Sequence, residues 1–449
     1  MIEFYIREIK HFLFHWLKNT ILLLTATLLA YTYHLHNTIE LNHIFKIIEQ
    51  TQEHYIVIGA IATTTLCYQI YKLIRQYKFR QLPYSFQFLN KTNESAKRVY
   101  DRYIKKKHDY YIYKNSSHRI DFKHYQSEYE NIKYFFKVKE IVIKRFKDSS
   151  VGIKLGERLP KIVNFQMNKI KENYLYFGLG EEQDIYASID SIKHTLIASE
   201  TGGGKSNLMF LLMASFIKGL LNWNIEKLVM VDLKGNELAI FKPLKELFKE
   251  RIIFAYTMEE VKDLLKECEA DYQERKERLD SEALSDIYEL NAQEKKRVYG
   301  NIVFYIDELA QMTLKDENLY KNDKQYKETY LEVQKYMNRF LSLYRAMGFK
   351  MFLSTQSPRA EVITGLMKSN VPNRLMLRVN SKINANVIMD SDIYEDLEPI
   401  SVKEFPSGRG ILTIEGINNN KAMLVQIPYI EKSVIKGYVK DLLTHKENR

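Results

Sequence analysis

The 449-residue chain has few residues of three types that mark particular protein classes: 2 cysteines, 8 prolines and 17 glycines. Cys67 and Cys268 are too few for a disulfide scaffold or for a zinc site built from cysteines. The scarcity of proline and glycine argues against long flexible linkers. Apolar residues make up 45% and charged residues 27%, as in ordinary globular proteins, and the length allows two or three domains.

Excess positive charge is confined to one segment. The whole chain carries a net charge of +11, and residues 81–180 alone carry 21 Lys and Arg against 10 Asp and Glu, which is again +11. Residues 181–449 carry 38 basic against 41 acidic side chains. The net charge of the chain is therefore no argument that its largest part binds nucleic acid.

Two apolar runs, residues 12–33 and 55–74, predict a transmembrane hairpin within residues 1–80. Each is close to the ~20 residues that a helix needs to cross a bilayer. The loop between them has one basic residue, Lys46, whereas Lys and Arg are dense after the second run. The positive-inside rule therefore predicts a multi-pass membrane protein with two spans, whose termini and remaining residues are cytoplasmic.

Residues 81–164 predict a basic juxtamembrane adaptor with the character of a small α+β module. Residues 134–146 alternate in part between basic and apolar side chains, which favours strands. Lys and Tyr are interleaved around residues 100–113. Such a pattern fits contact with anionic lipid, and it also fits single-stranded nucleic acid held by phosphate contacts and base stacking. Both interpretations stay open.

The strongest motif is S-E-T-G-G-G-K-S at residues 199–206. It follows an apolar run, 194–198, that predicts a buried strand, and it precedes a run from Asn207 that predicts a helix. A strand, a glycine-rich loop and a helix in this order are typical of a phosphate-binding P-loop. Ser199 stands where the pattern G-x-x-x-x-G-K-[ST] usually has its first glycine. The predicted nucleotide-contacting residues are Ser199, Glu200, Thr201, Gly202, Gly203, Gly204, Lys205, Ser206 and Asn207.

The chemistry of such a loop assigns a role to its last residues. Consecutive glycines let backbone N–H groups surround a phosphate, and the helix N-terminus favours an anion. Lys205 would reach the β- and γ-phosphates of ATP, and the Ser206 hydroxyl would bind Mg²⁺. The sequence therefore predicts ATP and Mg²⁺ as ligands.

A second apolar strand, predicted over residues 302–306, ends in Asp307 and Glu308. Asp307 would hold Mg²⁺ directly or through water, and Glu308 would orient and deprotonate the attacking water. Further strands are predicted at 227–231, 251–255 and 350–355, and a helical stretch at 258–292. Alternating strands and helices predict an α/β fold, a RecA-like P-loop motor with a parallel central sheet whose ligand groups gather at the carboxyl ends of the strands.

Several of these segments resemble the motor domain of the FtsK/SpoIIIE family of membrane-anchored DNA translocases, within the HerA–FtsK group. D-L-K-G-N-E-L at 232–238, T-Q-S-P at 355–358 and I-T-G-L at 363–366 are more specific than the P-loop. The resemblance covers roughly residues 165–430 and implies a motor domain over 165–449. It also implies an ATPase that works as a homo-hexameric ring and moves DNA.

The resemblance implies roles for further residues by position. Gln356 resembles the sensor that reports the state of the γ-phosphate. Arg345 is the first candidate for an arginine finger that reaches the ATP of a neighbouring subunit, with Arg374 and Lys368 as second choices. Together with Lys205 and Glu308, Arg345 and Gln356 form the predicted catalytic set.

Within the family, two spans and an end soon after the motor resemble the conjugative coupling proteins of Gram-positive bacteria. This resemblance implies a protein of the bacterial cell membrane that delivers relaxase-bound DNA, single-stranded rather than duplex, to the transfer channel. One alternative is a double-stranded DNA translocase for chromosome or plasmid segregation. Another is a protein-export ATPase of the type VII kind, although those chains usually carry several motor domains in tandem.

Overall fold

The structure is a computed structural model that describes residues 64–65, 68, 102–107, 110–114, 122–138, 140–146, 149–389, 397 and 401–447. These residues divide into two compact units between Glu157 and Arg158. The two predicted transmembrane runs lie outside the described residues, apart from Thr64, Thr65 and Tyr68. Within the described ranges, no helix is long and apolar enough to cross a membrane.

The smaller unit is an antiparallel sheet with two short helices. Its strands are paired in the order β1-β2-β4-β3. Its core includes Tyr113, Tyr125, Ile132, Ile143 and Ile153. Its elements are β1 (Arg102–Lys107), β2 (Tyr110–Lys114), α3 (Phe122–Ser127), α4 (Tyr129–Phe136), β3 (Ile141–Arg145) and β4 (Val151–Leu155).

The strand prediction for residues 134–146 is wrong in its first part. Residues up to Phe136 belong to α4, and only Ile141–Arg145 form a strand. Ile132 and Phe136 are buried four residues apart, the spacing of one helix face, and Glu130 pairs with Lys133 on the exposed side. The helical spacing of these buried residues therefore determines the structure up to Phe136, and the short alternation of basic and apolar residues does not.

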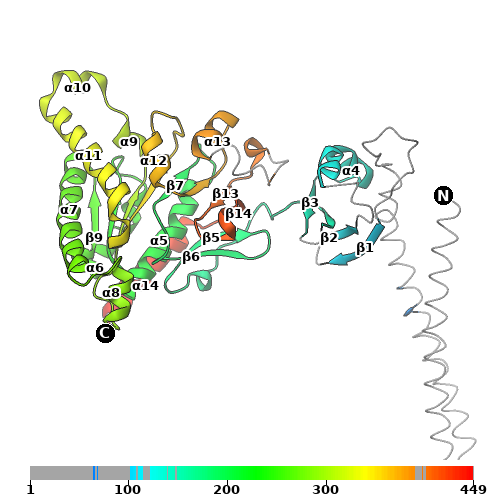
Figure 1. Cartoon of the computed structure of the whole chain (residues 1–449), viewed down its shortest axis with the longest axis horizontal. Helices are drawn as coiled ribbons and strands as arrows, with labels where there is room; N and C mark the ends of the chain where they lie inside the picture. The colour runs from blue at the N-terminus through cyan, green and yellow to red at the C-terminus, as the bar shows by residue number, and fades with distance from the viewer. Residues whose placement is uncertain are drawn as a thin grey trace, which may run out of the picture. The chain divides into compact units, whose positions relative to one another are not determined.

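The larger unit is built on one ten-stranded sheet (Figure 1). Six strands form its parallel part and four extend it with antiparallel pairing. In spatial order the parallel strands are β12 (Asn373–Met376), β7 (Thr195–Ala198), β11 (Phe349–Thr355), β10 (Asn301–Ile306), β8 (Ile225–Val231) and β9 (Ile252–Ala255). Continuing beyond β12, the antiparallel strands are β13 (Arg409–Thr413), β14 (Met423–Gln426), β5 (Tyr174–Gly180) and β6 (Asp184–Ser188).

The parallel core of the sheet confirms the predicted α/β fold, and the antiparallel extension is an addition that was not predicted. The predicted strands at 194–198, 227–231, 251–255, 302–306 and 350–355 correspond to β7, β8, β9, β10 and β11. β5 with β6 and β13 with β14 are each joined by short connections, which antiparallel pairing permits and parallel pairing does not.

Both faces of the parallel strands are buried, because apolar side chains alternate between two cores. Along β10, Phe304 and Ile306 pack in one core, whereas Val303 and Tyr305 pack in the other. One face is covered by α5 (Lys205–Leu221), α6 (Leu244–Phe248) and α14 (Lys432–Glu447). The other is covered by α7 (Met258–Ser281), α8 (Ile287–Gln293), α11 (Lys324–Leu343), α12 (Gly365–Asn370) and α13 (Lys382–Ile388).

The predicted helical stretch 258–292 is confirmed as α7 and α8. α7 begins with a capping box in which Thr257 and Glu260 each bond to the other's backbone N–H. Val261 and Leu265 then place their side chains in the core at helical spacing. α7 packs along α11 on the same face of the sheet (Figure 1).

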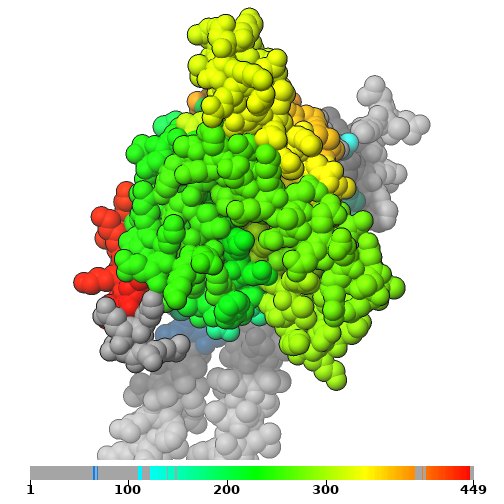
Figure 2. All heavy atoms as spheres, turned by 90° about the vertical axis from the view of Figure 1, so that its left-hand side faces the viewer, coloured from blue at the N-terminus to red at the C-terminus, as the bar shows by residue number. Residues whose placement is uncertain are grey.

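The remaining helical segments are short. α10 and the first turns of α11 project from the body of the larger unit (Figures 1 and 2). The short segments are η1 (Met167–Lys169), η2 (Leu238–Phe241), η3 (Lys249–Arg251), α9 (Ala310–Thr313), α10 (Glu317–Asn322), η4 (Tyr344–Met347), η6 (Val402–Glu404) and η7 (Asn418–Asn420).

Candidate nucleotide site at the carboxyl ends of the parallel strands

The loop between β7 and α5 is fixed by backbone hydrogen bonds to two neighbouring segments. The N–H of Ser199 donates to the carbonyl of Thr355 over 3.1 Å, and the N–H of Glu200 donates to the carbonyl of Arg378 over 3.1 Å. Within the loop, the N–H of Gly203 donates to the carbonyl of Glu200 over 3.0 Å. The loop is therefore held by the ends of β11 and β12, the two neighbours of β7 in the sheet.

Gly204 is the position in this loop that most strictly requires glycine. Its φ of +107° lies in the left-handed region, and a Cβ atom there would lie 2.6 Å from the backbone nitrogen of Gly408. Ser199 is accommodated because its buried hydroxyl donates to the carbonyl of Glu200 over 2.9 Å. The loop therefore keeps the P-loop path with serine at its first position.

The loop presents backbone donors at the start of a long helix. Within the described residues, the N–H groups of Gly202, Gly204, Lys205 and Ser206 have no hydrogen-bond acceptor. α5 has 17 residues, and its dipole adds partial positive charge at the same end. Converging N–H groups and a helix N-terminus bind phosphate oxygens.

Lys205 and Asp307 form a buried ion pair beneath the loop. The ammonium of Lys205 lies 2.6 Å from Oδ1 of Asp307 and donates to the Asp307 carbonyl over 2.9 Å. Both side chains are almost fully buried. Burial raises the pKa of the Asp307 carboxyl, and the Lys205 ammonium offsets part of that rise.

Glu308 is oriented by donors from the end of β11. Its Oε1 accepts a hydrogen bond from the Thr355 hydroxyl over 2.7 Å, and both of its oxygens lie 3.2 Å from the N–H of Gln356. The Thr201 hydroxyl donates to the side-chain carbonyl of Gln356 over 3.3 Å. Gln356 therefore bridges the Glu308 carboxylate and the phosphate loop.

A turn after β8 brings two further charged side chains to the site. The buried Asp232 carboxylate accepts from the N–H groups of Gly235, Glu237 and Leu238, which folds the turn back on the strand end. Lys234 then lies 3.5 Å from Oε2 of Glu308, and Ser206 Oγ lies 3.4 Å from a Glu237 oxygen. Lys234 and Glu237 lie in the D-L-K-G-N-E-L segment, and the sequence alone did not predict them as site residues.

Thr355 and Arg378 were also missed. Thr355 is the last residue of a buried strand, where a hydroxyl can turn toward the strand end. Arg378 follows β12, which was not among the predicted strands. Its guanidinium donates to the carbonyl of Gly202 over 3.0 Å. A polar residue at or just after the carboxyl end of a parallel strand is the signal that could have found both.

Arg345 and Asn207 lie away from the centre of this site. Arg345 is exposed in η4, before β11 begins, and so belongs to the opposite edge of the sheet from Lys205. Asn207 accepts a hydrogen bond from the N–H of Ile430 over 3.2 Å and links α5 to the chain after β14. The side chain of Arg374, a second-choice finger, is buried and donates to the carbonyl of Lys368 over 2.8 Å.

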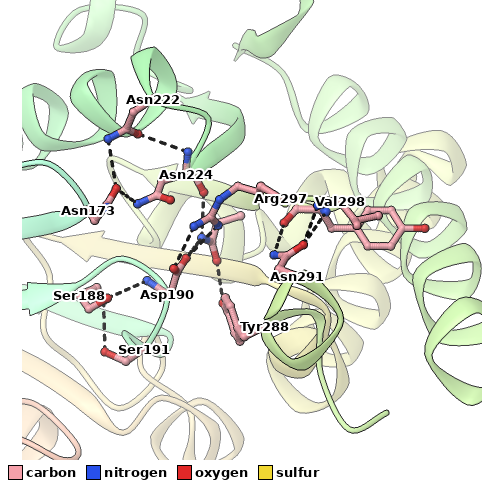
Figure 3. A network of polar contacts seen from close by, with 12 residues as sticks. Asn173, Ser188, Asp190, Ser191, Asn222, Asn224, Tyr288, Asn291, Arg297 and Val298 are labelled. Carbon is pink, nitrogen blue, oxygen red and sulfur yellow. Dashed lines mark hydrogen bonds and ion pairs between the residues drawn. The ribbon is translucent and has the colours of Figure 1, made fainter. Parts of the chain in front are cut away.

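The opposite edge of the sheet carries a network of paired polar groups (Figure 3). The Asp190 carboxylate accepts two hydrogen bonds of 3.1 Å from Arg297 and one of 2.7 Å from Asn301. Asn301 also accepts from the Tyr288 hydroxyl over 2.7 Å. These contacts join the loops that lead into β7 and β10.

A phosphate loop after β7, with a paired lysine, and two carboxylates after β10, which β11 separates from β7 in the sheet, form a P-loop nucleotide site. Residues 167–387 match the FtsK/SpoIIIE family. The chain therefore carries a domain of the FtsK/SpoIIIE family.

Individual proteins agree with this result. The DNA translocase FtsK of Chlorobaculum tepidum is 26% identical over 302 residues, which cover 64% of this chain and 35% of that protein. The DNA translocase SpoIIIE of Bacillus subtilis is 24% identical, over 67% of this chain and 37% of that protein. The chain thus spans little more than a third of the length of these relatives.

A solved structure shares the fold. The pCW3 conjugation coupling protein TcpA, in a monomeric form with ATPγS, matches with a TM-score of 0.55 and 19% sequence identity. The match covers 82% of this chain and 99% of that one.

Proposed function

We propose that this chain is a membrane-anchored, ATP-driven DNA translocase that acts as the coupling protein of a conjugative transfer system. The observation that carries the proposal is the meeting of Lys205, Asp307, Glu308 and Gln356 with the phosphate loop at one edge of the sheet, within an FtsK/SpoIIIE domain. DNA is the substrate to be moved, because the matched relatives are DNA translocases.

The residues of the site have separate roles in ATP hydrolysis. The loop N–H groups and Lys205 bind the phosphate oxygens, and Lys205 exchanges its 2.6 Å contact with Asp307 for the nucleotide. Glu308, held by Thr355 and Gln356, accepts a proton from water as the water oxygen attacks the γ-phosphorus. The bond from that phosphorus to the bridging oxygen of ADP breaks.

The site fits Mg²⁺ by the chemistry of its donors. Ser206 and Asp307 supply a hydroxyl and a carboxylate oxygen, the ligands that this ion prefers alongside phosphate oxygens and water. Glu237 lies beside Ser206 and adds a second carboxylate near that position. When bound, the ion neutralises charge on the phosphates.

Assembly and anchoring are part of the same proposal. A homo-hexameric ring would bring Arg345, which is exposed and remote from its own P-loop, to the nucleotide of a neighbouring subunit. The two apolar runs near the N-terminus would form the anchor in the bacterial cell membrane and leave the motor in the cytoplasm. Relaxase-bound DNA would be the cargo and the transfer channel its destination.

The extent of the match to the coupling protein favours conjugation over segregation. Residues 158–449 are 292 of 449 residues, or about 65% of the chain, whereas the match covers 82%. The match therefore also includes residues before Arg158. A translocase for chromosome or plasmid segregation is the second candidate, because the relatives named FtsK and SpoIIIE share the motor region.

The test is ATP hydrolysis by the purified full-length chain without DNA, with single-stranded DNA and with duplex DNA. We expect stimulation by single strands above that by duplex, and no hydrolysis by the Lys205→Ala variant under any condition. Preference for duplex would favour segregation. Hydrolysis that responds to neither DNA would contradict translocation and favour protein export.

A further inference from the structure

Arg378 lies on the phosphate loop of its own chain. It follows β12 by two residues, and β12 is the parallel neighbour of β7. Its Nη2 atom is 3.0 Å from the carbonyl of Gly202 and 3.0 Å from the place that a Cβ atom on Gly202 would occupy. The guanidinium is therefore in van der Waals contact with the loop that would hold the phosphates.

The charge of Arg378 has no counter-ion within the described part of the chain. It forms no ion pair, and its side chain makes one hydrogen bond, to a neutral carbonyl. Arg297 and Arg339, in contrast, each hold a carboxylate through two hydrogen bonds. A partly exposed guanidinium with several unused donors beside an anion cradle is suited to an anionic ligand.

The backbone that carries Arg378 is locked to the loop. The carbonyl of Arg378 accepts from the N–H of Glu200, and the Glu200 carboxylate accepts from the N–H of Asn380 and from the side-chain amide of Asn384, both over 2.9 Å. Asn384 belongs to α13, whose N-cap is Ser381. The backbone at Arg378 and just after it is thus held against the loop.

We propose that Arg378 is a further nucleotide-binding residue, which contacts the β- or γ-phosphate of ATP bound to the same chain. Glu200 is the positioning residue that holds it there, through Asn380 and Asn384. This inference rests on the proposed ATPase function. It differs from the arginine finger, because Arg345 would act on the nucleotide of a neighbour whereas Arg378 acts on its own.

The first test measures nucleotide affinity in the full-length chain with a Glu308→Gln background, which removes turnover. Arg378→Ala should weaken binding of ATP by about 10²-fold, ADP by less and AMP by little, because the contact is to the outer phosphates. Arg378→Lys should recover part of the ATP affinity. Equal losses for ATP, ADP and AMP would overturn the proposal, since they would mean a distorted loop.

A matched control removes another cation from the same segment. Lys382 is exposed at the start of α13, four residues from Arg378. Lys382→Ala should leave the affinity for ATP unchanged, and a loss equal to that of Arg378→Ala would assign the effect to general charge. The Lys205→Ala variant separates the proposed ATPase function from the role of Arg378. If Lys205→Ala still hydrolyses ATP, the proposed function fails. If Arg378→Ala binds ATP with wild-type affinity, only the role of Arg378 is refuted.

Subunit mixing tests the same-chain assignment. In a mixture of Arg378→Ala with Glu308→Ala chains, every site lacks one of the two residues if both act on the same nucleotide, so hydrolysis should stay at the sum of the separate variants. Recovery of hydrolysis would place Arg378 at a neighbour's site and overturn the assignment. Glu200→Ala should weaken ATP binding less than Arg378→Ala, and the double variant should be no weaker than Arg378→Ala alone. Additive losses would refute the positioning role of Glu200.

Discussion

The two edges of the parallel sheet use charged residues in opposite ways. At the amino edge, Arg297 donates two hydrogen bonds to the Asp190 carboxylate (Figure 3). The side-chain amide of Asn301 donates a third. At the carboxyl edge, Arg378 has one neutral carbonyl as its acceptor, and Lys234 reaches Glu308 only at 3.5 Å. At the amino edge these paired groups stabilise the fold, whereas Arg378 keeps donors that an anionic ligand could occupy.

Two buried lysines, one at each edge of the sheet, differ in the partners of their ammonium groups. Lys205 faces the Asp307 carboxylate at the carboxyl edge. Lys350, at the amino edge, donates to the carbonyls of Asp190 and Ile192 over 3.0 and 2.6 Å. Burial lowers the pKa of Lys350 to about 7. Lys350 is thus a structural donor, whereas Lys205 keeps a partner that a phosphate can replace.

The largest expected effect comes from removing the lysine of the carboxyl edge. Lys205→Ala should lower kcat for ATP hydrolysis by about three orders of magnitude or more, because the transferring phosphoryl group loses its buried cation. Steady-state hydrolysis by the full-length chain measures this, with circular dichroism as the control for folding. Hydrolysis within a few fold of wild type would remove Lys205 from the site.

An intermediate effect, on stability alone, is expected at the amino edge. Arg297→Met should lower the free energy of unfolding by about 1–2 kcal/mol, because the partly exposed Asp190 loses two charge-assisted hydrogen bonds. Well below the melting temperature, kcat should match wild type. Denaturant unfolding and ATP hydrolysis are measured on the same preparations. A variant with unchanged stability and impaired hydrolysis would contradict the division between the two edges.

A third expected effect is a change in how stability depends on pH. Lys350 has a native pKa near 7 and an ordinary value of 10.5, so between these values the unfolded chain binds a proton that the native chain does not. This group therefore makes stability rise as pH increases from about 7 toward 10. Lys350→Met should abolish that part of the slope.

Melting temperatures at pH 6.5, 7.5 and 8.5 test this prediction. The difference between Lys350→Met and wild type should move in favour of wild type as the pH rises. Lys382→Met, at an exposed lysine, serves as the control and should show no such trend. A difference that is constant with pH would mean that Lys350 is not the titrating group.

Much of the motor could be predicted from local patterns. Five buried strands are recognisable because β-branched and aromatic residues are concentrated in short runs, and the loop at 199–206 lies between one of them and a helix. The position of Asp307 and Glu308 near the phosphate loop could also be predicted, because parallel strands end at a common edge of the sheet. The long helix α7 could also be predicted from the sequence, since its N-terminal capping box and its helical spacing of apolar residues lie within one segment.

The rest depended on contacts between distant residues. β12 begins with Asn373 and Arg374 and so has no apolar run to mark it as a strand, and Arg378 was missed with it. The partners of Glu308 come from the end of β11, 47 and 48 residues away, and the carboxylate of Glu200 bonds to a helix 184 residues away. Residues 134–136 were assigned to a strand together with the alternating residues that follow them, but they form the last turn of α4.

The sequence by itself determined the chemistry that is available: a glycine loop that can adopt positive φ, a lysine and a serine after it, and two carboxylates after a buried strand. These are local properties of short segments. Only the tertiary structure decided which charged side chains form ion pairs. These pairs depend on the order of the strands and on the register of β12 and β11 beside β7. That order brings Lys205 to Asp307, leaves Arg378 without a carboxylate within the described residues, and puts Arg345 on the far edge.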